Sequence, residues 1–302
     1  MVPAGGVGVI GLGVMGAAMT ARLLAAGIGV TVWNRTRSKC GALADQGAVP
    51  AESAAAVAER AGTVLVSLAD QDAVDHVVFG PGGLVQSLRP GGVIVDTSTV
   101  SPGFARTLAD RAGRTGHHAL DARVLGNAEH ARAGELRVMV GGERGVFERV
   151  APLLTVLGKE VSYLGDSGSA AAMKLVLNML MGVEMQALAE AVVLGERAGL
   201  SRQSVLQTIA ASGFSSPVMR FKCGVMGRRA FTPADFRLAL MHKDMALVRA
   251  EAQRLEVPVP SADAAYGMLT AAVGQGLGDL DCAAVLSFME RSPEGAPPGT
   301  DA

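Results

Sequence analysis

The sequence predicts an α/β domain with a doubly wound, mostly parallel sheet, followed by an all-helical domain. Short apolar runs of β type alternate with helical runs in the first half of the 302-residue chain, and this alternation ends near residue 165. Strands that alternate with helices are typical of a parallel sheet with helices on both faces. Apolar residues make up 49% of the chain and charged residues 18%, which provides enough apolar material for two cores.

The elements of the α/β domain follow from two hydrophobic periods. Strands appear as short runs rich in Val and Ile, and helices as longer runs with apolar residues every three or four positions. The predicted strands are Val7–Ile10, Val30–Trp33, Thr63–Leu68, Gly92–Asp96, Ala119–Val124, Leu136–Val140 and Glu160–Leu164. The predicted helices are Val14–Ala26, Arg37–Gly47, Ala51–Ala61, one that begins near Ser101-Pro102, and Gly145–Leu157.

From Ser169 onward the pattern is helical. The predicted helices are Ser169–Ala198, Ser201–Ala211, Pro233–Leu255, Ala262–Gly274 and Leu280–Glu290. The first contains a long apolar stretch, but Asn178, Glu184, Gln186 and Glu190 interrupt it, which favours a buried helix over a membrane span. We expect domains at residues 1–166 and 167–290, and a disordered tail, rich in Pro and Gly, at 291–302.

Charge and cysteine content restrict the class of protein. With 27 basic and 28 acidic residues the net charge is −1, which gives no preference for nucleic acid or for an anionic membrane. Three widely spaced cysteines without a CxxC pair argue against disulfides and structural zinc, and no other metal-binding pattern is present. The uncharged N-terminal segment lacks the basic start of a signal peptide, so we expect a cytosolic protein.

Local basic clusters are interpreted as solvated surface, with contact to an anionic ligand as the alternative. They are Arg123, Arg132 and Arg137, and Arg220, Lys222, Arg228 and Arg229.

A GxGxxG motif lies between the first strand and the first helix: Gly11, Leu12, Gly13, Val14, Met15 and Gly16. This context makes the motif a dinucleotide fingerprint, in which the glycines permit a tight turn, close approach of the pyrophosphate, and close packing of helix on strand. The N-terminus of the helix offers N–H groups to the phosphates. The motif therefore predicts a Rossmann domain, and the alternative is a plain glycine turn that serves packing only.

The second strand ends in Asn34, Arg35 and Thr36. An enzyme that uses NAD commonly has Asp or Glu at this position to bind the ribose 2′-OH. An arginine and a hydroxyl instead suit a 2′-phosphate, and no acid is present to repel it. The sequence therefore favours NADPH. The alternative is that Arg35 is only exposed and that NADH binds as well.

Two further stretches are expected at the carboxyl ends of strands, beside the same cofactor. One is Leu68, Ala69 and Asp70, and the other contains Ser98 and Thr99. Because a helix begins nearby, the hydroxyls of Ser98 and Thr99 have two equal interpretations, helix capping and ligand contact.

Lys174 and Asn178 are four residues apart on the long helix and therefore share one face of it. That face is otherwise apolar. A buried lysine there would have a lowered pKa and would suit proton transfer. The alternative, a lysine that extends to solvent, is favoured if the residue is considered alone.

Several motifs together resemble the β-hydroxyacid dehydrogenase family, over nearly the whole chain. They are the glycine motif at 11–16, Asp-Thr-Ser-Thr at 96–99, Asp121-Ala122, Met173-Lys174 with Asn178, Glu190, Lys243-Asp244, and Gly-Leu-Gly-Asp-Leu-Asp at 276–281. The Trp-Asn-Arg-Thr stretch and the 276–281 stretch are most similar to the glyoxylate/succinic semialdehyde reductase branch, which prefers NADPH.

The resemblance implies residue roles and an assembly. Lys174 would act as the general acid/base, Asn178 would hold the substrate, and Thr99 would contact both cofactor and substrate. Phe236 and Lys243 would contact the cofactor and Asp244 the substrate, all from the helical domain. That domain would also form a homodimer.

The substrate loop departs from the family pattern Asp-x-Pro-Val-Ser-Gly-Gly. This chain has Arg123 in place of the proline and Leu125 in place of the serine that binds the substrate carboxylate. The amides of Gly126 and Asn127 remain available for an anion, with help from Arg123. The alternative is a larger or less polar substrate.

The sequence thus predicts reduction of a small aldehyde or keto acid by NADPH, reversibly. Two rivals are considered. An imine reductase shares the fold and the Asn-Arg-Thr loop, and Leu125 suits an apolar amine, but such enzymes usually lack the lysine. A binding module without catalytic activity is disfavoured by Lys174 and Asn178.

Overall fold

The computed structural model describes residues 6–291, which form two compact units divided between Lys174 and Leu175. The predicted boundary was 166/167. The division in the structure falls eight residues later, because the first turns of the long helix α8 (Ser169–Arg197) belong to the first unit. Of the predicted tail, Arg291 ends helix α13 and the remaining residues lie outside the described range.

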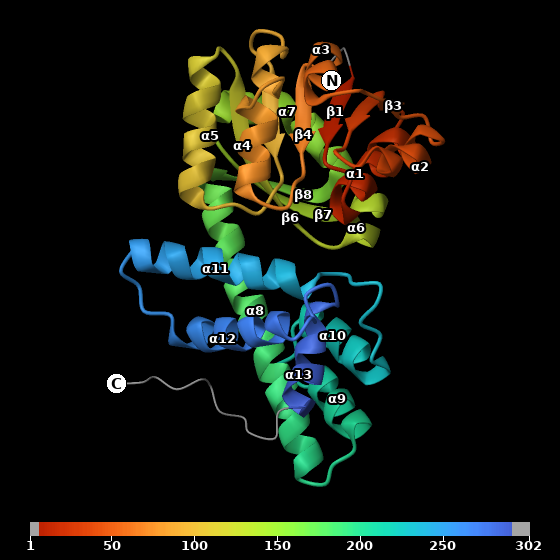
Figure 1. The fold of residues 1–302 in the computed structure, drawn as a ribbon, viewed down its shortest axis with the longest axis vertical. Coiled ribbons are helices and arrows are strands. Elements are labelled where there is room, and N and C mark those ends of the chain that lie inside the picture. Colours follow the sequence, from red (N-terminus) through yellow and green to blue (C-terminus); the bar gives the residue numbers. More distant parts are fainter. Residues whose placement is uncertain (1–5, 292–302) are drawn as a thin grey trace. The chain divides into compact units, whose positions relative to one another are not determined.

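The first unit is built on one eight-stranded sheet (Figure 1). The strand order is β3-β2-β1-β4-β5-β6-β7-β8, and every neighbouring pair is parallel except β6 with β7. This confirms the predicted doubly wound, mostly parallel sheet. The strands are β1 (Val7–Ile10), β2 (Val30–Trp33), β3 (Val49–Pro50), β4 (Thr63–Val66), β5 (Val93–Asp96), β6 (His118–Leu125), β7 (Leu136–Gly141) and β8 (Gly158–Gly165).

Helices cover both faces of this sheet. Successive side chains of a strand point to opposite faces, and in β1 both sets are apolar, so each face packs against helices. Val9 belongs to the core on one face and Ile10 to the core on the other. The first core is completed by α1 (Val14–Ala25), α2 (Gly41–Ala44), α6 (Ala128–Ala133) and α7 (Arg144–Leu157). The second is completed by α3 (Ala54–Arg60), α4 (Gln71–Phe79) and α5 (Pro102–Arg114).

The strand order indicates where a ligand would bind. From β1 the chain runs outward to β2 and β3, and it then returns to pair β4 with the other side of β1. In open α/β sheets, ligands bind at the carboxyl ends of the strands where the order reverses in this way. The glycine motif follows β1 directly, so it lies at this reversal.

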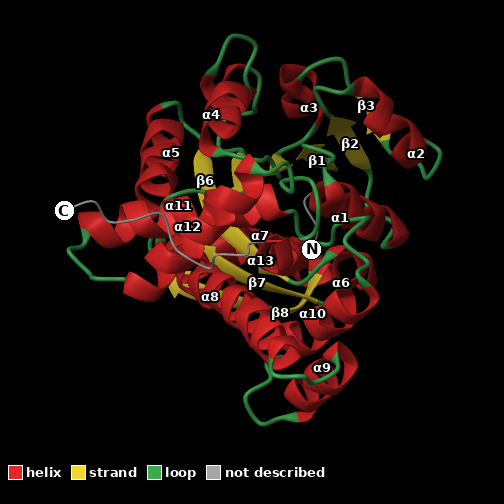
Figure 2. Cartoon of the chain, turned by 60° about the horizontal axis from the view of Figure 1, so that its bottom comes forward, coloured by secondary structure: helices red, strands yellow, loops and turns green. Residues whose placement is uncertain are grey.

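The second unit is helical: among its described residues the one β-type pairing is an isolated bridge between Arg237 and Asp281. Figure 2 shows its helices in red. Besides α8 they are α9 (Arg202–Ala211), α10 (Pro217–Arg228), α11 (Leu238–Arg254), α12 (Pro260–Gly274) and α13 (Val285–Arg291). Of the short 3₁₀ turns, η3 (Cys282–Ala284) lies in this unit, whereas η1 (Arg37–Cys40) and η2 (Leu84–Gln86) lie in the first unit.

The helices of this unit differ from the prediction at three places. The helix expected from Leu280 begins only at Val285, after the 3₁₀ turn Cys282–Ala284. The helix expected from Pro233 begins only at Leu238, because the N–H groups of Asp235 and Phe236 donate to the Asp281 carboxylate instead of forming helical hydrogen bonds. The sequence also missed α10, whose start is marked by the Ser216 hydroxyl, which accepts from the amide of Met219, and by Pro217 in the first turn.

Helix α8 is long and apolar enough to cross a membrane by length and composition, with a mean hydropathy of 1.4 in its most apolar window. Core helices of globular proteins meet the same criterion. The side chains of Met185, Leu188, Ala189 and Val192 are buried in the core of the second unit. This packing supports the interpretation of α8 as a core helix.

Candidate cofactor and catalytic site

The three motif glycines have distinct steric surroundings. Gly11 has a φ of 91°, and a Cβ on it would lie 2.2 Å from the Ser67 carbonyl oxygen. A Cβ on Gly16 would lie 1.9 Å from the carbonyl oxygen of Gly11, so this glycine permits helix α1 to pack closely on β1. Around Gly13, by contrast, no atom lies within 4 Å of a Cβ position. The backbone at Gly13 is therefore open to a ligand.

The N-terminus of α1 fits a pyrophosphate. Its N-cap residue is Gly13, so no side chain caps the first turn, and no acidic residue lies in that turn. The first amides of a twelve-residue helix thus have neither a side-chain acceptor nor a repelling charge beside them. The open backbone at Gly13 and these amides together form a cradle with the chemistry that a dinucleotide phosphate requires.

Asn34 connects the glycine motif to the end of β2. Its Oδ1 accepts a hydrogen bond from the Leu12 amide at 2.9 Å, and its Nδ2 donates to the Thr36 carbonyl at 3.0 Å. Arg35 is exposed between them. The next arginine, Arg37, is instead paired with Glu52. The side-chain amide of Asn34 thus lies where enzymes that use NAD commonly have an acid for the ribose, and Arg35 is next to it.

At the ends of β4 and β5, the capping interpretation of the Ser98 hydroxyl is wrong, and its contact with a ligand stays a prediction. Ser101, not Ser98, caps α5 by accepting from the Phe104 amide. Ser98 Oγ instead accepts from the Leu68 amide at 2.9 Å and so joins the two loops. Asp70 caps α4 by accepting from the Ala73 amide, so its carboxylate serves the helix start.

Thr99 follows Ser98 at the same sheet edge and is half-buried, and Ala69 is exposed beside Leu68. Both residues therefore lie where the sequence placed them, in loops that leave the carboxyl ends of β4 and β5.

At the end of β6 and in the turn after it, two residues that were expected to bind substrate, Arg123 and Asn127, have partners within the protein. Asn127 caps α6: its Oδ1 accepts from the amides of Glu129 and His130, and its own backbone N–H donates to His130 Nδ1 at 3.4 Å. The Asn127 amide that was expected to be available for an anion therefore already has a partner. Arg123 is fully buried, and its guanidinium pairs with Asp96. We therefore place Arg123 among the residues that support the site. Leu125 is half-buried and Gly126, with a φ of 125°, is exposed.

Lys174 reaches this loop. Its Nζ donates to the carbonyl oxygen of Val124 at 3.0 Å, and the side chain is half-buried. The start of its helix is fixed by Asp121, whose two carboxylate oxygens accept from the amides of Gly168 and Ala171, each at 2.9 Å. Burial raises the pKa of Asp121, although Arg123 and these two amides lower it in part. The lysine is thus held beside the end of β6 from both strand and helix.

In the second unit the predicted residues form a connected polar group. Asn178, one turn beyond Lys174 on α8, donates from Nδ2 to Asp244 Oδ2 at 2.6 Å, and both side chains are buried. Lys243 Nζ lies 2.8 Å from the other carboxylate oxygen of Asp244. Phe236 is half-buried and packs against the core of the unit. The structure therefore brings Asn178, Lys243 and Asp244 together.

Sequence reasoning missed a buried ion pair. Lys222, interpreted as surface, is 1% exposed, and its Nζ lies 2.9 and 2.8 Å from the two carboxylate oxygens of Asp281. Burial lowers the pKa of Lys222, but Cys282 and Asp281 together raise it above its ordinary value. Asp281 also accepts from the Phe236 amide, so this pair fixes the segment that carries Phe236. No local signal in the sequence marks it.

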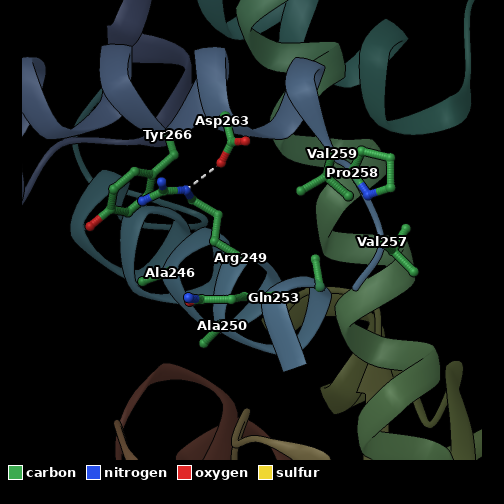
Figure 3. A pocket seen from close by; sticks show the side chains of 10 residues that line it. Ala246, Arg249, Ala250, Gln253, Val257, Pro258, Val259, Asp263 and Tyr266 are labelled. Carbon is green, nitrogen blue, oxygen red and sulfur yellow. Dashed lines mark hydrogen bonds and ion pairs between the residues drawn. The ribbon is translucent and has the colours of Figure 1, made fainter. Parts of the chain in front are cut away.

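A cavity of about 500 Å³ lies between α11 and α12, and Figure 3 shows its lining. Arg249 extends toward Asp263, with which it forms an ion pair, and its guanidinium lies 4.5 Å from the centre of the Tyr266 ring. The two charges therefore compensate each other. None of the predicted site residues lines this cavity, and we assign it no catalytic role.

Two family models match the chain, one in each part. The model of the NAD binding domain of 6-phosphogluconate dehydrogenase matches residues 6–165. The model described as NAD-binding of NADP-dependent 3-hydroxyisobutyrate dehydrogenase matches residues 168–289. The two matches therefore span nearly all of the described chain.

Curated relatives and solved structures agree with these models. Glyoxylate/succinic semialdehyde reductase 1 of Arabidopsis thaliana is 36% identical over 95% of this chain and 99% of its own length. The 2-(hydroxymethyl)glutarate dehydrogenase of Eubacterium barkeri is 35% identical over 94% and 95%. The 3-hydroxyisobutyrate dehydrogenase structure from Salmonella typhimurium has a TM-score of 0.87 at 28% identity, covering 93% of this chain and 99% of that one.

An imine reductase from Myxococcus stipitatus, in complex with NADP⁺, is a more distant structural neighbour. Its TM-score is 0.63 at 26% identity, with coverage of 94% of this chain and 99% of the other.

The fold and the glycine cradle, with these relatives, define an NAD(P)-dependent oxidoreductase that acts on CH–OH groups. The chain belongs to the β-hydroxyacid dehydrogenase family, as its motifs predicted.

Proposed function

We propose that the protein is an NADPH-dependent reductase of small aldehydes or keto acids, which it converts reversibly to hydroxyacids, with Lys174 as general acid/base. The observation that carries this proposal is the 3.0 Å hydrogen bond from Lys174 Nζ to the Val124 carbonyl at the start of the substrate loop. It places an ammonium group beside the segment in which the family binds its substrate.

When bound, the nicotinamide cofactor supplies or accepts the hydride at the substrate carbon. The glycine cradle binds the phosphates, and Lys174 donates a proton to the carbonyl oxygen during reduction, or accepts it during oxidation. Asn178 orients the substrate, and Asp244 fixes the amide of Asn178 through the 2.6 Å hydrogen bond. Thr99, Phe236 and Lys243 contribute to cofactor binding.

NADPH is the proposed cofactor because Arg35 is exposed beside Asn34 and Thr36, where a 2′-phosphate would lie. Asn34 already uses its amide within the protein and carries no charge that would repel a phosphate. NADH is the alternative, with lower affinity.

The proposed substrates are short carbonyl compounds with a carboxylate. The named activities of the relatives, glyoxylate and succinic semialdehyde reduction, involve such compounds. Because Leu125 has no side-chain donor, the carboxylate would depend on the backbone N–H groups of Gly126 and Asn127. The Asn127 N–H would then exchange its 3.4 Å hydrogen bond to His130 Nδ1 for one to the carboxylate. We further propose a homodimer in the cytosol that binds neither nucleic acid nor membrane.

Reduction of a cyclic imine is the second candidate. Leu125 favours it, because an apolar side chain suits an amine substrate, and a structural neighbour is an imine reductase. Lys174 opposes it, since its ammonium group suits protonation of a carbonyl oxygen.

The deciding experiment measures NADPH consumption by the purified protein with glyoxylate, with succinic semialdehyde and with a five-membered cyclic imine. Turnover of the two acids without turnover of the imine is the expected result. Turnover of the imine alone would overturn the proposal in favour of the second candidate. Binding of NADPH, followed by its fluorescence, controls for a folded protein.

A further inference from the structure

Arg123 is a buried arginine near the end of β6, and the proposed reaction does not use it directly. The last paired residues of β5 and β6 are Asp96 and Asp121, so Arg123 lies two residues beyond that pairing, beside the segment that leaves β5. Because strand side chains alternate, it shares a sheet face with Asp121. Its position is thus next to both the cofactor loops and the start of α8.

One guanidinium nitrogen of Arg123, Nη1, donates the hydrogen bonds of this side chain. Nη1 donates to Asp96 Oδ2 at 2.9 Å, to the Asp96 carbonyl at 3.1 Å, and to the carbonyl of Ser98. Both charged side chains are fully buried. Nε and Nη2 have no hydrogen-bond partner within residues 6–291. Loss of the arginine would therefore leave the carboxylate of Asp96 buried without its counter-charge.

These contacts fix the loop after β5, which also has hydrogen bonds to β4 and to the segment after it. The Ser98 amide donates to Asp96 Oδ1 at 3.0 Å, and Ser98 Oγ accepts from the Leu68 amide. Thr97 Oγ1 donates to the Val66 carbonyl at 2.9 Å. The carboxyl ends of β4, β5 and β6 thus form one hydrogen-bonded network, in which Arg123 supplies the positive charge.

The same stretch of β6, residues 121–124, also contacts Lys174 and the start of its helix. Asp121 caps α8 through Gly168 and Ala171, and Arg123 is the principal charge that favours the ionised form of Asp121. The carbonyl of Val124, the next residue after Arg123, accepts from Lys174 Nζ. The backbone at Arg123 and Val124 therefore joins the Ser98–Thr99 loop to the proposed proton donor.

We propose that Arg123 is a positioning residue: it holds the Ser98–Thr99 segment at a fixed place relative to Lys174, and so aligns the cofactor loop with the proton donor. This inference rests on the proposed function. It assigns Arg123 no contact with the substrate, because the guanidinium is buried against Asp96 and Ser98.

The test compares Arg123→Met and Arg123→Lys with wild type, and uses Arg111→Met as the matched control. Arg111 also pairs with an aspartate, Asp75, but it is half-exposed and lies between α4 and α5, away from the network. For each variant, kcat and KM are measured with succinic semialdehyde and with butanal, its uncharged analogue. The dissociation constant of NADPH is measured by fluorescence.

For Arg123→Met we expect kcat to fall about tenfold or more with both aldehydes, an unchanged ratio of their KM values, and weaker NADPH binding. Arg123→Lys should recover part of the loss because it keeps the charge, and Arg111→Met should stay within about twofold of wild type. If Arg123→Met does not fold, kcat is measured for Arg123→Lys instead, and we expect an equal loss of kcat with both aldehydes.

A rise in KM for succinic semialdehyde alone would overturn the inference, because it would show that Arg123 binds the carboxylate through its Nε–Nη2 edge. Unchanged kinetics and unchanged NADPH binding would also overturn it. If wild type reduces neither aldehyde, the proposed function fails, and the NADPH affinity of the Arg123 variants still tests the loop.

Discussion

Lys174 Nζ donates to the carbonyl oxygen of Val124 at 3.0 Å, a contact across 50 residues of sequence. It fixes the side chain at the loop where the family binds substrate, while the helix start is held separately by Asp121. The side chain of Lys174 therefore has a defined direction, because both its Nζ and the start of its helix are fixed by hydrogen bonds. This is the arrangement that a general acid requires, because proton transfer depends on position within hydrogen-bond reach.

We predict that Lys174→Met lowers kcat by about 10²- to 10⁴-fold, the usual contribution of a general acid. The change should leave the NADPH dissociation constant within a few-fold, since the glycine cradle is untouched. Steady-state reduction of succinic semialdehyde and NADPH fluorescence measure the two quantities. Lys159→Met, an exposed lysine on β8, is the control. Retention of more than a tenth of kcat in Lys174→Met would remove the lysine from the mechanism.

Cofactor selectivity provides a second prediction. Arg35→Ala should raise KM for NADPH by about tenfold or more and leave KM for NADH nearly unchanged, because a hydrogen bond to a charged phosphate contributes about 1.5–3 kcal/mol. Arg37→Ala is a close control: Arg37 is also exposed and lies two residues further, but it is paired with Glu52. Equal loss with both cofactors in Arg35→Ala would contradict a role at the 2′-phosphate.

Features determined by local sequence were the ones that could be predicted. The strands β1 and β2 have the predicted bounds, and the glycine cradle follows from a turn and a helix start that are adjacent in sequence. Among the strands and α-helices, β3, α4, α6 and α10 were missed, and short length explains only β3 and α6. Strand β3 has two exposed residues and helix α6 has six residues, too few for a hydrophobic period to appear.

The supporting network could not be predicted because its partners are distant in sequence. Arg123 and Asp96 are 27 residues apart, and Lys222 and Asp281 are 59 apart. A lysine indicates surface by residue type alone, and only the fold shows that Lys222 is buried. The backbone amide of Asn127 was likewise expected to be available for an anion, because α6, whose capping box uses this amide, was not predicted.

The departure at Leu125 leads to a third prediction. Leu125→Ser should lower KM for succinic semialdehyde by roughly tenfold, because a hydroxyl can donate to the carboxylate and a hydrogen bond to a charged group contributes about 1.5–3 kcal/mol. KM for butanal should rise or stay unchanged. Leu125→Ala separates the loss of bulk from the gain of the hydroxyl. An equal gain in both variants would show that space, not hydrogen bonding, limits carboxylate binding at this loop.

The buried cluster around Cys282 leads to a prediction about stability and pH. Burial raises the pKa of the Cys282 thiol from 9.0 to about 12, since Lys222 only partly offsets the loss of solvation. The folded state therefore holds this proton more tightly than the unfolded state does. The contribution is fully present below pH 9.0 and is lost as pH rises toward about 12, by about 1.4 kcal/mol for each pH unit.

Cys282→Ala removes this thiol, so its free energy of unfolding should decline less steeply than that of wild type above pH 9.0. Urea unfolding at pH 8, 9, 10 and 11 measures the difference, which should be constant up to pH 9 and should then shift progressively in favour of the variant. Groups that do not interact with Cys282 cancel in the comparison; Lys222 does not, because Cys282 contributes to its pKa. Cys40→Ala, which removes a buried cysteine of the first unit, is the control. A difference that stays constant up to pH 11 would show that the Cys282 thiol ionises as readily in the folded protein as in the unfolded chain.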